Sequence, residues 1–288
     1  MRKSEDIFAV VVVYNKKCDD SETCKALSLL EKGIVNVIVY DNCDKSTGYK
    51  AYNEEYCKAR EWRYLTSGKN VGLSKAYNAC IDLILMETMQ GTICLFDDDT
   101  HIEDKYFKAL TTEKCEGKGD IFVPFVYSKG RLLSPSYITP NYLTKRINRV
   151  EQIMSIDSRK LTAINSGMAI DLSVFHNYRY DEEIFLDGVD HNFLKDMVSN
   201  GRRLKIISYN CNHEFSGDNK PDLSSALYRF QIFTSDYKHI LKNNRIAYLV
   251  LAGKRAMRLA MQYKTTRFFQ LLFSQNKDSE RIMQKEKS

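Results

Sequence analysis

The first hundred residues alternate between short apolar runs and segments of helical periodicity, and this alternation limits the possible folds most strongly. Residues 8–13 (FAVVVV) form a continuous β-branched run, which is typical of a strand buried on both faces. Further strands are predicted at 35–40, 62–66 and 92–96, and the helices between them at 19–32, 46–59 and 73–89. Strands that alternate with helices of this length predict βαβ units, and therefore an α/β fold with a mainly parallel sheet.

The alternation weakens after residue 126. Residues 128–158 are rich in hydroxyl and basic side chains and are predicted to be mostly loop. Order is expected to return at 163–171, with a helix at 189–199 and a strand at 204–209. From residue 223 onward the pattern is helical, basic and aromatic.

Composition excludes several other classes of protein. Hydrophobic residues make up 43% of the 288 residues and charged residues 28%, which is typical of a globular chain. No apolar run approaches the roughly 18–20 residues that span a bilayer, and the charged start lacks the apolar core of a signal peptide, so a cytoplasmic protein is expected. The eight cysteines form no C-x-x-C pair, which favours reduced thiols over a disulfide framework or a zinc site.

The positive charge is concentrated at the C-terminal end. Residues 241–288 hold 11 Lys/Arg against 3 Asp/Glu, or +8, whereas the whole chain carries +6. This segment is predicted either to touch anionic lipid or to pack as a helical subdomain on the rest of the chain or on a second subunit in a homodimer. No nucleic-acid partner is expected, because no RNA- or DNA-binding motif accompanies the charge.

Three consecutive carboxylates, Asp97, Asp98 and Asp99, follow the predicted strand at 92–96. Their mutual repulsion would be offset by a bound divalent cation, and Mg²⁺ or Mn²⁺ prefers carboxylate oxygens together with phosphate oxygens. The alternative is an acidic turn before the next helix. Because ligands bind at the carboxyl ends of parallel strands, the position after a strand favours the metal site.

Two other polar segments are expected at the same edge of the sheet. Asp41 and Asn42 follow the predicted second strand, where an acid can accept hydrogen bonds from a ribose or a base, or can form an Asx-turn. Residues 68–72 (GKNVG) precede a helix whose N-terminus favours phosphate, although they match no established phosphate-binding motif.

In this order, these motifs resemble the family 2 glycosyltransferases with the GT-A fold. The resemblance is strongest to rhamnosyltransferase-like members of bacterial surface-polysaccharide biosynthesis, and it covers about residues 8–217. The matching positions are Tyr14, Asn15, Asp41, Asn42, Asn70, Gly72, Asn78, Asp97, Asp99, Ser166, Gly167, the segment Phe185–Asp190 (FLDGVD), His213 and Gly217. It implies a GT-A domain at 1–217, with a nucleotide-binding half at about 1–100 and an acceptor half at about 101–217, and a basic helical region at 218–288.

The resemblance also implies roles for individual residues on the donor side. Asp41 would hold the nucleotide base, with Tyr14 and Asn15 beside it, and Asp98 would face the ribose. Asn42, Asn70, Gly72 and Asn78 would complete the nucleotide-sugar site. Asp97 and Asp99 would hold a divalent metal, Mn²⁺ or Mg²⁺, on the diphosphate.

On the acceptor side, the resemblance implies that Asp190 is the general base, with Asp187 as its competitor. Lys195 stands where relatives have arginine, and keeps the charge without the bidentate fork. Ser166 and Gly167 would belong to the acceptor or secondary site. His213 would complete the metal shell or touch the diphosphate; its alternative is a structural loop histidine.

The implied function is that of an inverting glycosyltransferase that uses a dTDP- or UDP-linked sugar and a saccharide or lipid-linked acceptor, at the inner face of the cell membrane if it touches lipid. A rhamnosyl group is the first candidate for the sugar, and galactofuranosyl or another hexosyl group is the alternative. Two further alternatives are a nucleotidyltransferase and a non-catalytic protein that binds sugar nucleotides. The Tyr14–Lys17 segment lacks the glycines of the former, and the Asp97, Asp99 and Asp190 set argues against the latter.

Overall fold

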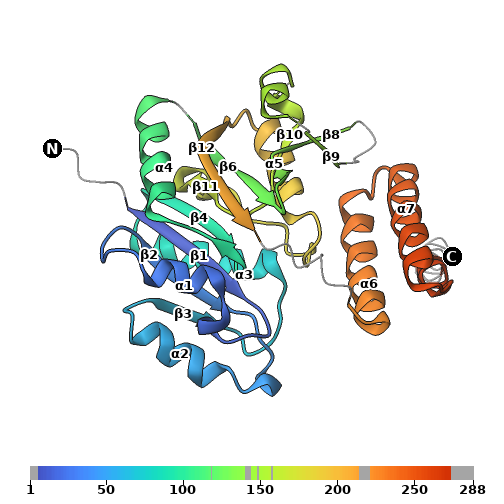
Figure 1. The fold of residues 1–288 in the computed structure, drawn as a ribbon, viewed down its shortest axis with the longest axis horizontal. Helices are drawn as coiled ribbons and strands as arrows, with labels where there is room; N and C mark the ends of the chain where they lie inside the picture. The colour runs from blue at the N-terminus through green and yellow to red at the C-terminus, as the bar shows by residue number, and fades with distance from the viewer. Residues whose placement is uncertain are drawn as a thin grey trace, which may run out of the picture.

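The structure, a computed structural model, describes residues 6–117, 119–139, 144–147, 149–156, 158–213 and 221–273. Within these residues the centre of the molecule is a nine-stranded sheet of order β3-β2-β1-β4-β11-β6-β12-β5, with β7 paired to β6 (Figure 1). Its strands are β1 (Ile7–Val13), β2 (Asn36–Asp41), β3 (Arg63–Thr66), β4 (Thr92–Asp97), β5 (Thr100–His101), β6 (Ile121–Ser128), β7 (Arg131–Ser134), β11 (Met168–Asp171) and β12 (Leu204–His213).

The first four strands of the sheet are parallel, as predicted, and they end at the same level. Val13 pairs with Asp41 and Val12 with Asp97. β11 runs antiparallel between β4 and β6, and β12 is again parallel to β6. The mainly parallel sheet is therefore confirmed, and its carboxyl edge brings the predicted polar segments together.

Helices cover both faces of the sheet, which explains why the β1 run is apolar throughout. The side chains of Val10 and Val12 pack with α3 (Leu73–Glu87) and α5 (Val189–Ser199). Those of Val11 and Val13 pack on the other face, which is covered by α1 (Glu22–Ser28), α2 (Lys50–Lys58) and α4 (Asp104–Glu116). A strand buried on both faces has no polar side to alternate with.

Two helices are shorter than predicted. The helix expected at 19–32 is a 3-10 turn, η1 (Cys18–Asp20), followed by α1, because the Ser21 side chain caps α1 by accepting a hydrogen bond from the backbone N–H of Cys24. The helix expected at 46–59 begins only at Lys50, after η2 (Lys45–Thr47) and the left-handed Gly48.

The prediction of mostly loop at 128–158 is wrong in part. Besides β7, this region contains β8 (Ser136–Ile138), β9 (Thr144–Arg146) and η3 (Val150–Ser155), and β8 and β9 join β10 (Leu161–Thr162) in a small antiparallel sheet. A small cluster of Ile147, Ile153 and Leu161 packs there. Strands of two or three residues have too short an apolar period to stand out in the sequence. The two remaining 3-10 turns are η4 (Ser158–Lys160) and η5 (Leu172–His176).

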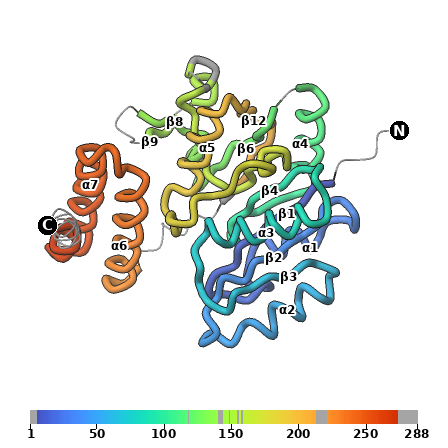
Figure 2. Tube along the Cα trace, turned by 180° about the vertical axis from the view of Figure 1, so that it is seen from behind, coloured from blue at the N-terminus to red at the C-terminus, as the bar shows by residue number. Residues whose placement is uncertain are grey.

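The basic C-terminal region is helical, as predicted. α6 (Leu223–Ile240) and α7 (Arg245–Tyr263) form an antiparallel pair, and residues 267–273 are helical too. They share a core of their own around Phe230, Ala252 and Phe268, and lie beside the sheet (Figure 2). None of the helices in the described ranges combines the length and the hydropathy needed to cross a membrane. The expected boundary at 217/218 falls outside the described residues, as does Gly217.

Candidate active site

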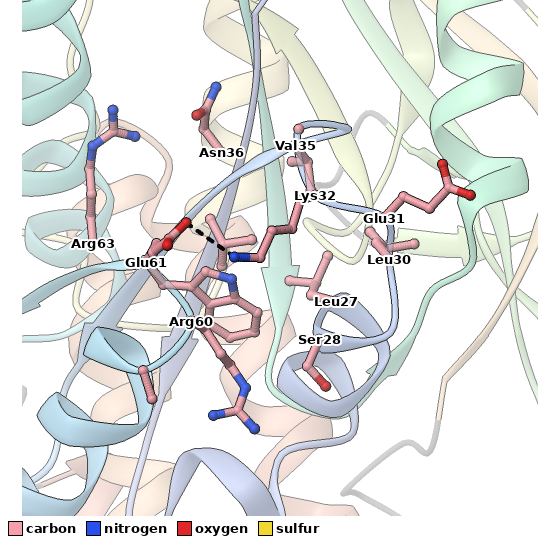
Figure 3. Close-up of a pocket in the computed structure, with 14 residues that line it drawn as sticks. Leu27, Ser28, Leu30, Glu31, Lys32, Val35, Asn36, Arg60, Glu61 and Arg63 are labelled. Atoms are coloured by element: carbon pink, nitrogen blue, oxygen red, sulfur yellow. Dashed lines mark hydrogen bonds and ion pairs between the residues drawn. The ribbon is translucent and has the colours of Figure 1, made fainter.

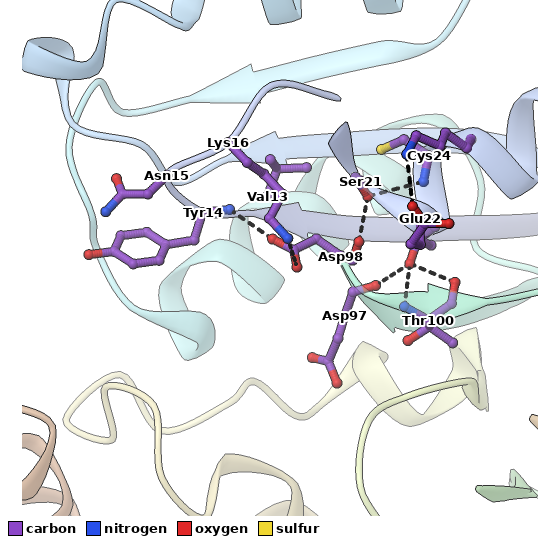
Figure 4. Close-up of polar contacts among 12 residues, drawn as sticks. Val13, Tyr14, Asn15, Lys16, Ser21, Glu22, Cys24, Asp97, Asp98 and Thr100 are labelled. Atoms are coloured by element: carbon purple, nitrogen blue, oxygen red, sulfur yellow. Dashed lines mark hydrogen bonds and ion pairs between the residues drawn. The ribbon is translucent and has the colours of Figure 1, made fainter. Parts of the chain in front are cut away.

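The turn that carries the three carboxylates is held by the start of α1 (Figure 4). The Ser21 hydroxyl donates to the backbone oxygen of Asp98 at 2.7 Å. The Thr23 hydroxyl donates to the backbone oxygen of Thr100 and accepts from its N–H, both at 2.9 Å. Because these are side-chain bonds to backbone, the turn keeps its shape without using the carboxylates themselves.

The carboxylates of Asp97 and Asp98 point in different directions (Figure 4). That of Asp98 accepts hydrogen bonds from the backbone N–H of Tyr14 at 3.2 Å and from Lys16 Nζ at 2.8 Å. Burial raises the pKa of Asp98 above its ordinary value, although Lys16 opposes this shift. Asp98 is thus bound to the end of β1, whereas the side chain of Asp97 points away from that contact.

Asp97 meets the Ser166–Gly167 turn. The Ser166 hydroxyl donates to Asp97 Oδ2 at 2.5 Å. Gly167 has a φ of +85°, its N–H donates to the backbone oxygen of Leu95, and its own oxygen accepts from the Tyr106 hydroxyl. The turn that leads into β11 therefore brings two predicted residues, Ser166 and Asp97, into direct contact across more than sixty residues of chain.

Asp41 is almost completely buried, with 1% of its surface exposed. Its Oδ2 accepts from Asn53 Nδ2 at 2.9 Å and from the Tyr64 hydroxyl at 2.8 Å, and its Oδ1 accepts from the N–H of Cys43 at 3.0 Å. A carboxylate offers about four acceptor positions, so about one remains for a ligand. The predicted contact with a nucleotide base would have to use that position.

Asn42 and Asn70 shape the loop before α3. Asn42 Nδ2 donates to Asn70 Oδ1 at 2.9 Å, while Asn42 Oδ1 accepts from the N–H of Val71 at 2.8 Å. Asn70 Oδ1 also accepts from the N–H of Gly72 at 3.0 Å. Asn15 lies on the neighbouring β1 end with a φ of +51°, and its N–H contacts Cys43 Sγ. The structure thus gathers these predicted donor-site residues at one edge of the sheet.

Asn78 is held by a different part of the chain. Its side chain exchanges hydrogen bonds of 2.9 Å with the backbone of Tyr180 in both directions, and also donates to Glu182. The structure therefore brings Asn78 to the segment that precedes Asp187 and Asp190, and its contacts hold that segment against α3.

The two candidate bases differ in their surroundings. Asp187 is paired with Arg229, with Nη1 to Oδ2 at 2.9 Å, and lies 3.7 Å from Arg255 Nη1. Asp190 lies in the first turn of α5 and accepts from the N–H of His191 at 2.7 Å. Burial raises the pKa of Asp187, and both arginines oppose this shift. Since Asp187 is engaged with two arginines, Asp190 is the better placed of the two to accept a proton.

Tyr77, a residue that sequence reasoning missed, lies close to both ends of the site. Burial above all, then the carboxylate of Asp97 and more weakly that of Asp190, raises the pKa of Tyr77 well above its ordinary value. Asp97 ends β4 and Asp190 lies in the first turn of α5, and Tyr77 is buried in the core that these two elements share. Tyr77 fits the apolar spacing of α3, and so no sequence signal distinguished it from an ordinary core residue.

Two further predicted site residues lie on later elements, His213 at the end of β12 and Lys195 on α5. The backbone of His213 pairs with Thr100, directly after Asp99, but its side chain lies outside the described residues. Lys195 lines a hollow on α5 together with His191, Asn192 and Tyr237. In the described part of the chain, no three His, Cys, Asp or Glu side chains form a group that could hold a metal by themselves.

A hollow of about 390 Å³ lies at the opposite end of the strands (Figure 3). It is bordered by Asn36 at the start of β2 and Arg63 at the start of β3, and Lys32 and Glu61 form an ion pair at its mouth. Ligands of open α/β sheets bind at the carboxyl ends of the strands. This hollow is therefore no part of the site built around Asp97 and Asp190.

Comparisons with known proteins agree with this geometry. The family model "Glycosyl transferase family 2" matches residues 8–179, more than half of the chain. The structure is similar to that of residues 1–349 of S. aureus TarS, with a TM-score of 0.50 and 15% identity over 83% of this chain and 73% of that one. It is also similar to GalNAc-T7, solved with UDP, GalNAc and Mn²⁺, with a TM-score of 0.57 and 11% identity over 82% of this chain and 52% of that one.

TarS 1–349 has also been solved with UDP-GlcNAc, and that structure has a TM-score of 0.51 and 14% identity over 81% of this chain and 66% of that one. A search of curated protein sequences finds no significant match. At such low identity the structural likeness establishes the fold, while the family model establishes the family. The chain belongs to glycosyl transferase family 2, and is a glycosyltransferase with a GT-A fold and C-terminal helices.

Proposed function

We propose that this enzyme transfers a sugar from a nucleoside diphosphate to an acceptor hydroxyl, with Asp190 as the general base. The observation that carries this proposal is that one short segment, residues 162–166, reaches both ends of the site. Ser166 donates to Asp97 Oδ2 at 2.5 Å, and the Thr162 hydroxyl lies 2.6 Å from Nδ1 of His191, the neighbour of Asp190. In a direct displacement, the leaving diphosphate and the attacking hydroxyl lie on opposite sides of the sugar. An acid on the side of the diphosphate and a second acid on the side of the acceptor suit that arrangement, which inverts the anomeric centre.

Asp97 and Asp99 are the proposed holders of a divalent metal, Mn²⁺ or Mg²⁺. Both are half-buried at the carboxyl edge of the sheet, which fits a site with two protein carboxylates completed by diphosphate oxygens. When bound, the metal neutralises negative charge on the leaving diphosphate. The Ser166 hydroxyl orients Asp97 by its bond to Oδ2, and His213 remains a proposed additional ligand from the adjacent strand.

Asp41, Asn42, Asn70 and Gly72 are the proposed nucleotide side of the site, within a proposed catalytic domain of residues 1–217. UDP is the first nucleotide to test, because TarS and GalNAc-T7 were solved with UDP or UDP-GlcNAc. dTDP remains the alternative, as does rhamnose for the sugar. The acceptor side is proposed at α5, where Lys195 and His191 line a hollow next to Asp190.

The test is a panel of UDP- and dTDP-linked sugars incubated with the purified chain, with and without Mn²⁺ or Mg²⁺. We expect metal-dependent release of the nucleotide from at least one donor. Asp190→Asn should lower kcat by about 10²–10⁴-fold, the range attributed to general-base catalysis, while the Kd for the nucleotide stays within about twofold.

Asp196→Asn is the matched control, because Asp196 lies on the same helix and its carboxylate accepts from the Tyr178 hydroxyl at 3.1 Å. It should keep native kcat. An Asp190→Asn enzyme as active as Asp196→Asn would rule out Asp190 as the base. Turnover that is unaffected by chelators would rule out the metal.

A further inference from the structure

The outer face of α7 exposes a stripe of apolar side chains. Ile246, Val250, Met257 and Met261 recur at helical spacing and therefore lie along one side of the helix. Their exposed fractions are 77%, 40%, 52% and 67%. The opposite side of α7, with Tyr248, Ala252 and Ala256, packs into the core of the helix pair. Within the described residues, the stripe is thus left uncovered.

The surroundings of this stripe are strongly basic. Residues 241–273 contain seven Lys/Arg and no Asp/Glu. Lys254 and Arg258 are exposed on the turns beside the stripe, and Arg245 and Lys264 are exposed at its two ends. Only Arg255 of this set is turned inward, toward Asp187. An apolar stripe flanked by cations has both components of binding to an anionic lipid surface.

We propose that the outer face of α7 is a docking surface for an anionic membrane. A second copy of the chain fits less well, because two such faces would bring like charges together. Anionic lipid supplies both the apolar phase and the negative charge.

The position of α7 allows such contact. In both views it is the element farthest from β1, and α6 lies between it and the sheet (Figures 1 and 2). On the side of α7 opposite the stripe, Arg255 pairs with Asp187. A membrane bound to the stripe would therefore lie close to the proposed acceptor side of the molecule. Docking itself requires no sugar transfer, and its test is independent of the proposed reaction.

The test is co-sedimentation of the full chain with vesicles of phosphatidylcholine, alone or mixed with phosphatidylglycerol. We expect binding to the mixed vesicles only, weakened by added salt. Met257→Glu/Met261→Glu should lower the partition coefficient at least about tenfold, because two charges replace the apolar contact. Met86→Glu is the matched control: Met86 is 83% exposed on α3, far from the basic face, and its variant should bind like the native chain.

Lys254→Glu/Arg258→Glu tests the charge separately and should also reduce binding to the mixed vesicles. Thermal unfolding of each variant shows whether it is folded. Failure of the native chain to bind mixed vesicles overturns the proposal. So does a Met257→Glu/Met261→Glu variant that binds as tightly as Met86→Glu. A native dimer that the same double variant converts to monomers, without any binding to vesicles, would assign the stripe to a second copy instead.

Discussion

Asp97 and Asp98 are adjacent in the chain, yet their side chains serve different parts of the molecule. Asp98 is bound to Tyr14 and Lys16, and burial raises its pKa. The folded state therefore binds a proton more readily than the unfolded chain, whose aspartate pKa is about 3.9. The contribution of Asp98 to the stability of the fold therefore falls as pH rises from that value through the raised pKa, because the charged carboxylate becomes the populated form.

Asp98→Asn should therefore be at least as stable as the native chain at pH 7, and its advantage should shrink as pH falls toward 4. The amide oxygen can still accept from the N–H of Tyr14. Thermal unfolding over this pH range measures the effect. Asp104→Asn is the control, and its stability relative to the native chain should change with pH in the opposite direction. Lys108 lowers the pKa of the exposed Asp104, so the native carboxylate stabilises the fold more as pH rises. If Asp98→Asn loses stability as pH rises, the pair with Lys16 outweighs the cost of burial.

At the scale of elements, α6 holds residues 185–188, the base loop, which leads into the proposed base, Asp190. Asp236 is 1% exposed in the middle of α6. Its carboxylate accepts from three consecutive backbone N–H groups, those of Phe185, Leu186 and Asp187, at 2.9, 2.9 and 2.7 Å. Arg229 of α6 and Arg255 of α7 pair with Asp187 in the same loop. The C-terminal helices thus shape the proposed acceptor side of the site.

Asp236→Ala should lower the free energy of unfolding by at least about 3 kcal/mol, because three buried N–H groups lose their acceptor. Asp222→Ala is the matched control on the same helix: Asp222 is an exposed N-cap that accepts from the N–H of Ser225, and its loss should cost about 1 kcal/mol. Urea unfolding measures both. Equal losses in the two variants would show that the Asp236 contacts contribute little beyond an ordinary cap.

This link between α6 and the base loop also shows what the sequence could and could not predict. The parallel half of the sheet was predictable because each strand is an apolar run followed by a polar turn. Asp97 and Asp98 stood out as polar residues at a strand end, whereas Ser166 was identified only through the resemblance to the family. Asp236 is the single acid in residues 223–273, which was the available signal, but its three donors lie about fifty residues away. Tyr77 carried no signal, because a buried tyrosine on a helix matches core spacing.

At the scale of the whole molecule, the base loop is enclosed between the donor side and the C-terminal helices. The N–H of Leu73 donates to the backbone oxygen of Phe185 at 2.7 Å, directly after Gly72. A Cβ at Gly72 would lie 2.5 Å from that same oxygen. On the other side, a Cβ at Gly188 would meet Ile240 at 2.9 Å. The loop of residues 68–72, the base loop and α6 therefore form one continuous contact.

Gly72→Ala should disrupt the contact between the loop of residues 68–72 and the base loop. Its φ of +84° strains any side chain, and the added methyl also collides with backbone. Gly33→Ala isolates the collision, because Gly33 has a similar φ of +88° and open space around it. We expect Gly72→Ala to lose at least about 1 kcal/mol more stability than Gly33→Ala, and to raise KM for the donor. Equal unfolding curves and equal KM values would contradict this contact.

The family match ends at residue 179, before the loop that Asp236 holds. Chimaeras between relatives would naturally be joined near that point or at residue 222, as if the helices beyond were an interchangeable module. The bonds of Asp236 and the pairing of Asp187 with Arg229 and Arg255 predict otherwise. A foreign helix pair would leave Asp187 without its arginines and the loop without its acceptor. Residues 180–273 must be exchanged together for a hybrid enzyme to keep a defined acceptor side.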